Sequence, residues 1–294
     1  MTAASGSPWG WSKAVSDYRG QSIALLTQHG KAQVIAPVLE PALSCAVVTV
    51  TGFDTDQLGT FTRDTPRLGS QLAAARRKAR IGMELSGLPV GLASEGSFGP
   101  DPWGGLFTWN VELLLLIDDR LGLEVVGMAQ GPGRSGHAQT GQWSELEMFA
   151  QQQGFPAHQL VLRPEGPDDA RMHKGVSDWT QLRQCFQACL AEAANGQVFA
   201  ESDLRAHANP TRMNRIGDAA RDLLARLQSR CPACDQPGYW LAERERGLSC
   251  ADCGAPTHDH RAEVWLCPAC KHRAVIPRQD RTGAEPRHCP HCNP

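Results

Sequence analysis

The sequence predicts a mixed α/β body followed by a small cysteine-rich tail. Apolar, β-branched segments alternate with helix-favouring segments in the first half, which is the pattern of an α/β fold. Eight of the eleven cysteines form four Cys-x-x-Cys pairs near the end of the chain, a pattern typical of metal binding. The 294 residues are 41% hydrophobic, enough for a sizeable core. The net charge of −2 argues against coating nucleic acid through charge alone.

The first half supplies strands and helices in alternation. QSIALLT is an apolar run that ends in polar residues, so it predicts a strand and a turn. SCAVVTV is β-branched, and the alanine- and arginine-rich segment after it favours helix. VGLAS is expected to be a strand that ends at Glu95 in a glycine loop. In order, we expect a strand at 21–27, a helix at 31–43 shortened or kinked by its prolines, a strand at 44–50, a helix at 69–85, a strand at 90–94 and a hairpin over 110–130.

The second half continues the alternation and ends in a long helix. Pro210 is expected to open that helix, with Asn209 as its N-cap. The helix runs up to the first cysteine pair, so it connects the body to the tail. The expected elements are a helix at 141–153, a strand at 158–164, a helix at 178–193, a strand at 197–203 and a helix at 209–228.

These elements predict three parts: a flexible leader at 1–20, an α/β body at 21–229 and tandem zinc ribbons at 230–294. No run of 18 uncharged apolar residues occurs, so we expect no membrane span. The start lacks a basic-then-apolar signal pattern, which favours a cytoplasmic location where cysteines stay reduced.

The tail has the ligand spacing of two structural zinc sites. Each Cys-x-x-Cys turn presents two thiolates, and two such turns complete a tetrahedral site that has no open position for a substrate. The gaps of 15 residues between the first two pairs and 18 between the last two are typical of zinc ribbons. Pairing in sequence order gives two consecutive ribbons, and crossed pairing is the alternative. The predicted ligands are Cys231, Cys234, Cys250, Cys253, Cys267, Cys270, Cys289 and Cys292.

The tail has no excess positive charge with which to bind phosphates. Residues 231–294 contain eight Lys or Arg and eight Asp or Glu. Trp240 and Trp265 could stack on bases, but in so small a core we expect them to cover the zinc sites. Contact with a protein partner or gating of a substrate is therefore the favoured role of the tail, with RNA binding as the alternative.

Glu95 is a lone carboxylate among small residues, after an apolar run. Glycines at 96 and 99 allow a tight turn or a close approach to a ligand. One interpretation is a catalytic or metal-binding acid. The other is a structural acid that caps a helix or ends a strand.

The first half resembles the inosine/xanthosine triphosphate pyrophosphatase superfamily, the ITPase and Maf-like proteins. Those enzymes begin with a strand and a T-x-N-x-x-K loop that leads into a helix. The stretch LLTQHGKAQVI matches it in Thr27 and Lys31, while His29 replaces the asparagine and the loop is one residue shorter. The family continues with an N-A-x-x-K-A helix, which AARRKA resembles through Lys78 and Ala79.

The resemblance covers about residues 21–130. Its last part is a strand that ends in an acidic, glycine-containing loop in the family. The stretch ASEGSFG resembles this loop, with Glu95 as its one acid. It implies a three-layer mixed-sheet body, with Lys31 and Lys78 holding phosphates and Glu95 binding magnesium. The whole chain, with RAHANPTRM before its ribbons, also resembles an uncharacterised bacterial family of unknown function.

Physical reasoning from the residues supports an anion site. Lys31 would stand at a helix N-terminus, where free N–H groups and the helix dipole favour an anion. The next helix adds a dense basic cluster, formed by Arg76, Arg77, Lys78 and Arg80. A solvated helix face explains Arg76 and Arg80 equally well. His29 is either a donor to phosphate or a turn residue.

Further acids and bases extend the candidate site. Asp54 and Asp56 follow the second strand. One of them together with Glu95 would suffice to bind magnesium, or both simply form a turn. Four charged or titratable residues at 201, 203, 205 and 207 lie at strand alternation and would share one face. Arg205 and His207 are therefore candidate substrate ligands, and an edge strand with salt bridges is the alternative.

The leading hypothesis is a cytoplasmic, magnesium-dependent hydrolase of nucleotide-like phosphoanhydrides, with Glu95 and Lys78 in catalysis and two structural zinc ions. The rival is a non-enzymatic module that binds a nucleotide or RNA and docks a partner through its zinc ribbons.

Overall fold

The computed structural model describes residues 17–55 and 69–294. The described chain divides into two compact units. The α/β unit comprises Tyr18–Arg120 and Val126–Leu224, and the ribbon unit comprises Leu121–Val125 and Ala225–Pro294, with Asp17. Each unit is considered by itself. None of the helices in the described ranges has the length and apolarity needed to cross a membrane.

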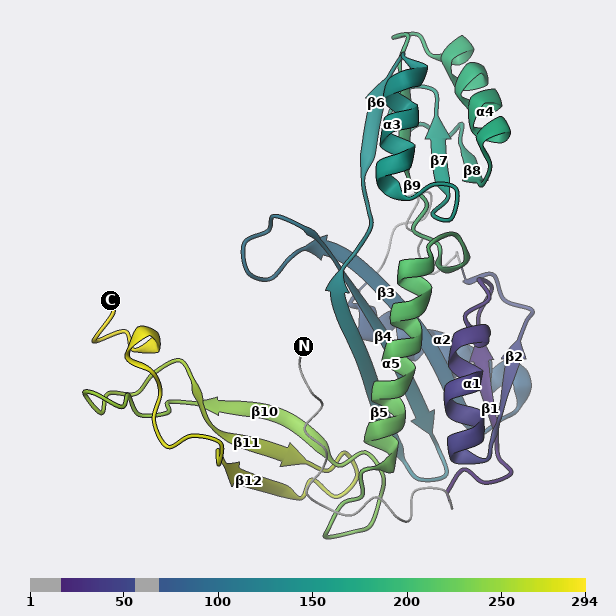
Figure 1. Ribbon diagram of the computed structural model, residues 1–294. Helices are drawn as coiled ribbons and strands as arrows, with labels where there is room; N and C mark the ends of the chain where they lie inside the picture. Colours follow the sequence, from purple (N-terminus) through teal and green to yellow (C-terminus); the bar gives the residue numbers. More distant parts are fainter. Residues whose placement is uncertain (1–16, 56–68) are drawn as a thin grey trace. The chain divides into compact units, whose positions relative to one another are not determined.

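A five-stranded mixed sheet forms the centre of the α/β unit (Figure 1). Its strands occur in the order β2-β1-β3-β4-β5, with β1 parallel to both neighbours and β4 antiparallel to β3. The strands β3 and β4 are paired over their whole length, from Val90 with Asp118 to Pro100 with Thr108. The bounds are β1 Ser22–Leu26, β2 Ala46–Val50, β3 Val90–Pro100, β4 Thr108–Asp118 and β5 Leu123–Pro132. The hairpin expected over 110–130 is confirmed as β4 and β5.

Helices cover both faces of this sheet. The helix α2 (Gln71–Ser86) packs on the face of Ala24 and Ala93, and a Cβ atom at Gly82 would lie 3.3 Å from Leu26. The other face carries α5 (Pro210–Gln228), whose Leu223 backbone nitrogen would lie 2.4 Å from a Cβ at Gly127. The helix α1 (Ala32–Leu43) contacts α5 where Val34 meets Gly217 and runs continuously through both prolines. Helices therefore lie on both sides of the mixed sheet.

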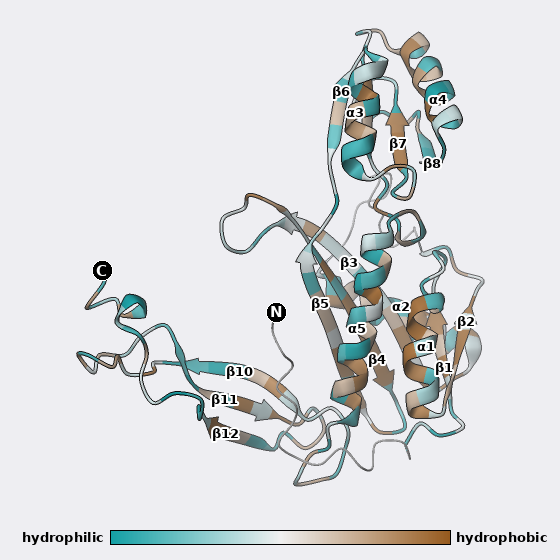
Figure 2. Ribbon diagram, in the orientation of Figure 1, coloured by the Kyte–Doolittle hydropathy of each residue, from teal (hydrophilic) through white to brown (hydrophobic). Residues whose placement is uncertain are grey.

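A second sheet lies between β5 and α5 in the sequence, and we call residues 137–202 the inserted subdomain. Its strands follow the order β6-β9-β7-β8, and all neighbours are antiparallel. The helices α3 and α4 bury Leu146, Phe149 and Phe186 against it. In Figure 2 the strand β7 is almost wholly apolar, in agreement with its burial. The bounds are β6 His137–Thr140, α3 Trp143–Gln153, β7 Leu160–Arg163, β8 His173–Val176, α4 Trp179–Glu192 and β9 Val198–Ser202.

Two sequence expectations are wrong at this level. The strand β3 does not end at Glu95 but continues through both glycines to Pro100, because β4 pairs with it along that whole length. The strands β6 and β8 were not expected, since HAQT and HKGV are short and mainly polar.

The N-cap at α5 is confirmed: the Asn209 Oδ1 accepts the backbone N–H of Arg212 at 3.0 Å.

The ribbon unit contains a three-stranded antiparallel sheet in the order β10-β11-β12. Its small core holds Tyr239 and Trp265 beside Cys231 and Cys267, with Trp240 packed against them. The aromatic side chains therefore cover a cysteine site, as expected. The bounds are β10 Trp240–Arg246, β11 His260–Leu266 and β12 Arg273–Pro277.

Candidate functional site

The topology of the central sheet marks one place for a ligand. The chain passes from β1 through α1 to β2 on one side, and from β2 through α2 to β3 on the other side of β1. Ligands of such sheets bind outside the carboxyl ends of the strands, where the connections diverge. That switch point lies between β1 and β3, next to Lys31 and Glu95. We call the residues gathered there the switch-point site: His29, Lys31, Lys78, Glu95, Arg205, His207 and Arg212.

Lys31 is the central cation of the switch-point site. Its side chain is buried, and its Nζ donates a 2.9 Å hydrogen bond to the carbonyl oxygen of Ser94 on β3. Burial and, after it, the positive charge of Arg212 lower the pKa of Lys31 to about 7, while the charge of Glu95 acts in the opposite direction. At neutral pH such a lysine is only partly protonated, and a bound anion would stabilise its charged form.

Lys78 and Glu95 form an ion pair between α2 and β3. The Lys78 Nζ lies 2.5 Å from a Glu95 carboxylate oxygen, and both side chains are almost completely buried. Alternation along β3 places Glu95 on the α2 face of the sheet, opposite the face of Ser94. The Gln71 Nε2 also donates to the Glu95 carbonyl oxygen at 2.7 Å and so fixes the start of α2 against the same strand position.

A second buried ion pair lies on the other face, and the sequence analysis missed it. The Arg212 Nε donates to a Glu112 carboxylate oxygen at 2.7 Å, and the Asn110 Nδ2 donates to the same oxygen at 2.9 Å. Gly96 leaves the room for this pair, since a Cβ there would lie 2.3 Å from that oxygen. The signal in the sequence is Glu112 itself, a lone acid within the apolar run of β4.

Two histidines from distant segments meet at the switch-point site. The rings of His29, in the β1–α1 loop, and His207 have centroids 5.1 Å apart. Burial lowers the pKa of His29 to about 4, with further contributions from the charges of Lys31, His207, Arg205 and Arg212. Burial followed by the charge of Arg205 lowers the pKa of His207, while Asp203 opposes that shift.

The face expected at 201–207 does not form, because β9 ends at Ser202. Glu201 pairs with Arg163 of β7 at 3.2 Å, and Asp203 is buried against Arg205 at 2.5 Å. His207 lies in a short 3-10 helix at Ala206–Ala208. Arg205 and His207 still reach the switch-point site, but through a turn and not through strand alternation.

The remaining candidates among the described residues are half-buried or exposed. Thr27 is half-buried directly after β1, whereas Arg76 and Arg77 are exposed on α2. The Thr55 hydroxyl bonds the Gln28 side chain at 3.1 Å, so the loop that carries the exposed Asp54 lies beside the β1–α1 loop. Asp56 falls outside the described residues.

The residues present do not form a ready magnesium site. Glu95 is bonded to Lys78, and Asp54 is exposed on another loop. Within the described ranges, the groups of three or more His, Cys, Asp or Glu donors that could hold a metal are the two cysteine tetrads.

The eight paired cysteines gather into two four-thiolate groups. The first joins Cys231 and Cys234 to Cys267 and Cys270, and the second is Cys250, Cys253, Cys289 and Cys292. Sulfurs across the groups lie 3.6 to 3.9 Å apart. A zinc ion with four sulfurs at about 2.3 Å in a tetrahedron requires about 3.8 Å between them, so both groups fit zinc.

Of the two pairings that the sequence leaves open, the structure has the crossed one, because the first pair joins the third and the second joins the fourth. Antiparallel pairing of β10 with β11 and of β11 with β12 explains the crossing. The turn before β10 and the turn between β11 and β12 meet at one end of the sheet, and the turn between β10 and β11 lies at the other.

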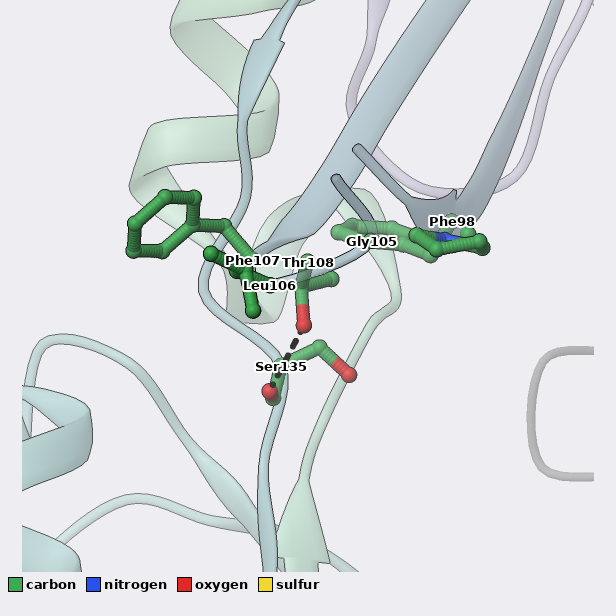
Figure 3. Close-up of a pocket in the computed structure, with 8 residues that line it drawn as sticks. Phe98, Gly105, Leu106, Phe107, Thr108 and Ser135 are labelled. Atoms are coloured by element: carbon green, nitrogen blue, oxygen red, sulfur yellow. Dashed lines mark hydrogen bonds between the residues drawn. The ribbon is translucent and has the colours of Figure 1, made fainter. Parts of the chain in front are cut away.

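A shallow cleft of about 360 Å³ lies at the β3–β4 connection and shares no residue with the switch-point site (Figure 3). Phe98, Leu106 and Phe107 line it, and the Thr108 hydroxyl donates to the Ser135 carbonyl oxygen at 3.3 Å across it. No charged side chain lines this cleft, so it offers nothing to a phosphate.

The fold and these sites define a mixed α/β protein with two four-cysteine groups suited to zinc and a basic site at its sheet switch point. The chain belongs to the family described as a domain of unknown function (DUF6671), whose model matches residues 78–294. No curated protein matches the chain. The match includes Lys78, Glu95 and all eight paired cysteines, while Lys31 precedes it.

Proposed function

We propose that the α/β unit binds a nucleotide-like molecule through its phosphates at the switch-point site and hydrolyses a phosphoanhydride bond. The observation that carries the proposal is that Lys31, bonded to the Ser94 carbonyl oxygen, lies close enough to the Lys78–Glu95 pair to feel both charges, beyond the carboxyl end of β1 and beside the middle of β3. Two lysines and one carboxylate in a largely buried setting supply charge stabilisation and a base, which are the needs of phosphoryl transfer. The sequence resemblance to the ITPase and Maf-like proteins supports the same chemistry.

The Lys78–Glu95 contact suggests how a bound phosphate frees Glu95 to act as a base. A phosphate oxygen competes with the Glu95 carboxylate for the Lys78 ammonium group, because both are anions that seek the same donor. Glu95 then orients a water molecule and accepts its proton as the water oxygen attacks phosphorus. The bond from phosphorus to the bridging oxygen breaks, and the leaving phosphate takes the electron pair. Lys31 neutralises charge that develops on the non-bridging oxygens.

The four-cysteine groups serve a structural role in this proposal. The residues that would hold zinc are the two tetrads, and the metal supplies the folding free energy of a small domain. With four protein ligands each, the sites leave no position for a substrate.

A screen for release of pyrophosphate or phosphate tests the proposal. The full zinc-loaded chain is incubated with canonical and deaminated nucleoside triphosphates, with and without magnesium. Glu95→Gln should lower turnover about 100-fold, the scale of losing one positioned base. Arg80→Met is the matched control, since Arg80 lies on the same helix but forms an exposed pair with Asp119. Absence of turnover with every nucleotide, or unchanged turnover in Glu95→Gln, would reject the hydrolase.

A second candidate, a non-enzymatic module that binds RNA, is favoured by the β3–β4 connection. Trp103 is 79% exposed there and meets Trp109 edge to face at 4.9 Å. The Asp101 carboxylate accepts hydrogen bonds from the backbone N–H groups of Trp103 and Phe107, which fixes the loop. An exposed aromatic ring on an ordered loop can stack on a base. A mobility shift with single-stranded RNA at two salt concentrations, compared between wild type and Trp103→Ala, tests this candidate.

A further inference from the structure

Basic side chains outnumber acids at the switch-point site. Arg205 is bonded to Asp203, Arg212 to Glu112, and Lys78 to Glu95, so each of these acids already has a cation. Among the described residues, no carboxylate forms an ion pair with Lys31, His29 or His207. Three further basic groups therefore converge without a matching acid.

Burial and the surrounding positive charges lower the pKa values of both histidines. The His29 imidazole is surrounded by Lys31, Arg205, His207 and Arg212, and its ring lies 5.1 Å from that of His207. The facing groups on other elements are Asp203, beside Arg205, and the Glu95 and Glu112 carboxylates near Lys31. Like charges nearby disfavour protonation, and groups with strongly shifted pKa values cluster at functional sites.

We propose that His29 and His207 hold the outer phosphate of a ligand whose inner phosphate lies at Lys31 and Lys78, so that the site selects a polyphosphate chain over a single phosphate. This inference rests on the phosphate-binding half of the proposed function. The two rings come from the β1–α1 loop and from the turn before α5, and one phosphate group has enough oxygens to accept an N–H from each.

The subsite couples ligand binding to proton uptake. An anion that accepts an N–H from each ring favours the charged form of the rings, so it raises the pKa of both histidines from their lowered values. Binding of the outer phosphate therefore takes up protons and strengthens as the pH falls toward about 6. A single phosphate at Lys31 and Lys78 does not engage the rings and shows a smaller dependence.

Calorimetric titration of the full zinc-loaded chain with inorganic phosphate, pyrophosphate and tripolyphosphate tests the subsite. At about pH 6 we expect pyrophosphate to bind at least about 10-fold more tightly than phosphate, the scale of added charge-assisted hydrogen bonds. The double variant His29→Gln, His207→Gln should lose that preference and keep its affinity for phosphate within about 2-fold. His137→Gln, on β6, is the matched control and should leave both affinities unchanged. Circular dichroism and zinc content establish that each variant is folded.

Each outcome separates the subsite from the proposed function. Equal affinity of the wild type for phosphate and pyrophosphate overturns the subsite. A double variant that retains the preference, or that loses phosphate and pyrophosphate equally, also overturns it. If the preference for pyrophosphate appears and depends on the histidines while no nucleotide is hydrolysed, the result supports the subsite and rejects the hydrolase. If the folded wild type binds none of the three anions, both the subsite and the proposed phosphate-binding function are rejected.

Discussion

Gly96 is the residue on which the buried contact between β4 and α5 depends. A side chain at this position would meet the Glu112 carboxylate at 2.3 Å and an Arg212 Nη atom at 2.7 Å. We expect Gly96→Ala to lower the free energy of unfolding by about 1–3 kcal/mol, the usual cost of overpacking. Gly99→Ala is the matched control, because nothing lies within 4 Å of a Cβ there. Urea denaturation of both variants measures the difference, and equal stabilities would contradict the geometry.

His29 should make stability depend on pH in a defined window. Burial and the surrounding cations lower its pKa from 6.5 to about 4 in the folded chain. Between these values the unfolded chain binds a proton that the folded chain does not, so stability rises with pH from about 4 to about 6.5. We expect His29→Gln to flatten this part of the profile. Thermal melts over the window measure the change, and an unaltered slope would show that His29 is not the titrating group.

At the scale of elements, the Lys78–Glu95 pair joins α2 to β3. Glu95→Gln should leave a largely buried ammonium group without its partner and cost about 3 kcal/mol. The double variant Lys78→Met, Glu95→Gln removes both charges and should recover most of that loss. The exposed Arg80–Asp119 pair on the same helix provides the comparison, since Arg80→Met should cost less than about 1 kcal/mol. Chemical denaturation of the wild type and these three variants measures the differences, and a double variant no more stable than Glu95→Gln would contradict the prediction.

The elements that the sequence predicts well are those with a strong local pattern. The first two strands and the β4–β5 hairpin carry apolar or β-branched runs with clear turn signals. The helix α2 is rich in alanine and arginine, which favour helix. The continuation of β3 past Glu95 could not be predicted, because the glycines at 96 and 99 suggest a loop unless the pairing with β4 is known. The Glu112–Arg212 pair joins residues 100 apart in the sequence, and no local pattern reports such a contact.

At the scale of the whole molecule, cysteine spacing predicts the number of metal sites better than their connectivity. Both pairings use the same four turns and leave no thiolate over, so local spacing does not distinguish them. The antiparallel three-stranded sheet determines the pairing, since it brings alternate Cys-x-x-Cys turns to the same end of the sheet. A non-local property of the ribbon unit thus determines which cysteines share an ion.

Deleting cysteine pairs in two combinations distinguishes crossed from sequential metal sites. Replacing Cys231, Cys234, Cys267 and Cys270 by Ser removes one complete site in the crossed arrangement, so one zinc per chain should remain. Replacing Cys231, Cys234, Cys250 and Cys253 removes half of each site, so no tightly held zinc should remain, because each site keeps only two thiolates. Sequential pairing predicts the reverse for both variants.

Elemental analysis of chelator-free protein measures the metal content of these two variants, with two zinc ions per chain expected for the wild type. Cobalt substitution adds a check on ligand number, since the single site retained in the first variant should give the absorption of a four-thiolate centre while the second variant should not. Because each variant loses four cysteines, loss of thiols alone cannot explain a difference between them. One zinc in the second variant and none in the first would overturn the crossed arrangement.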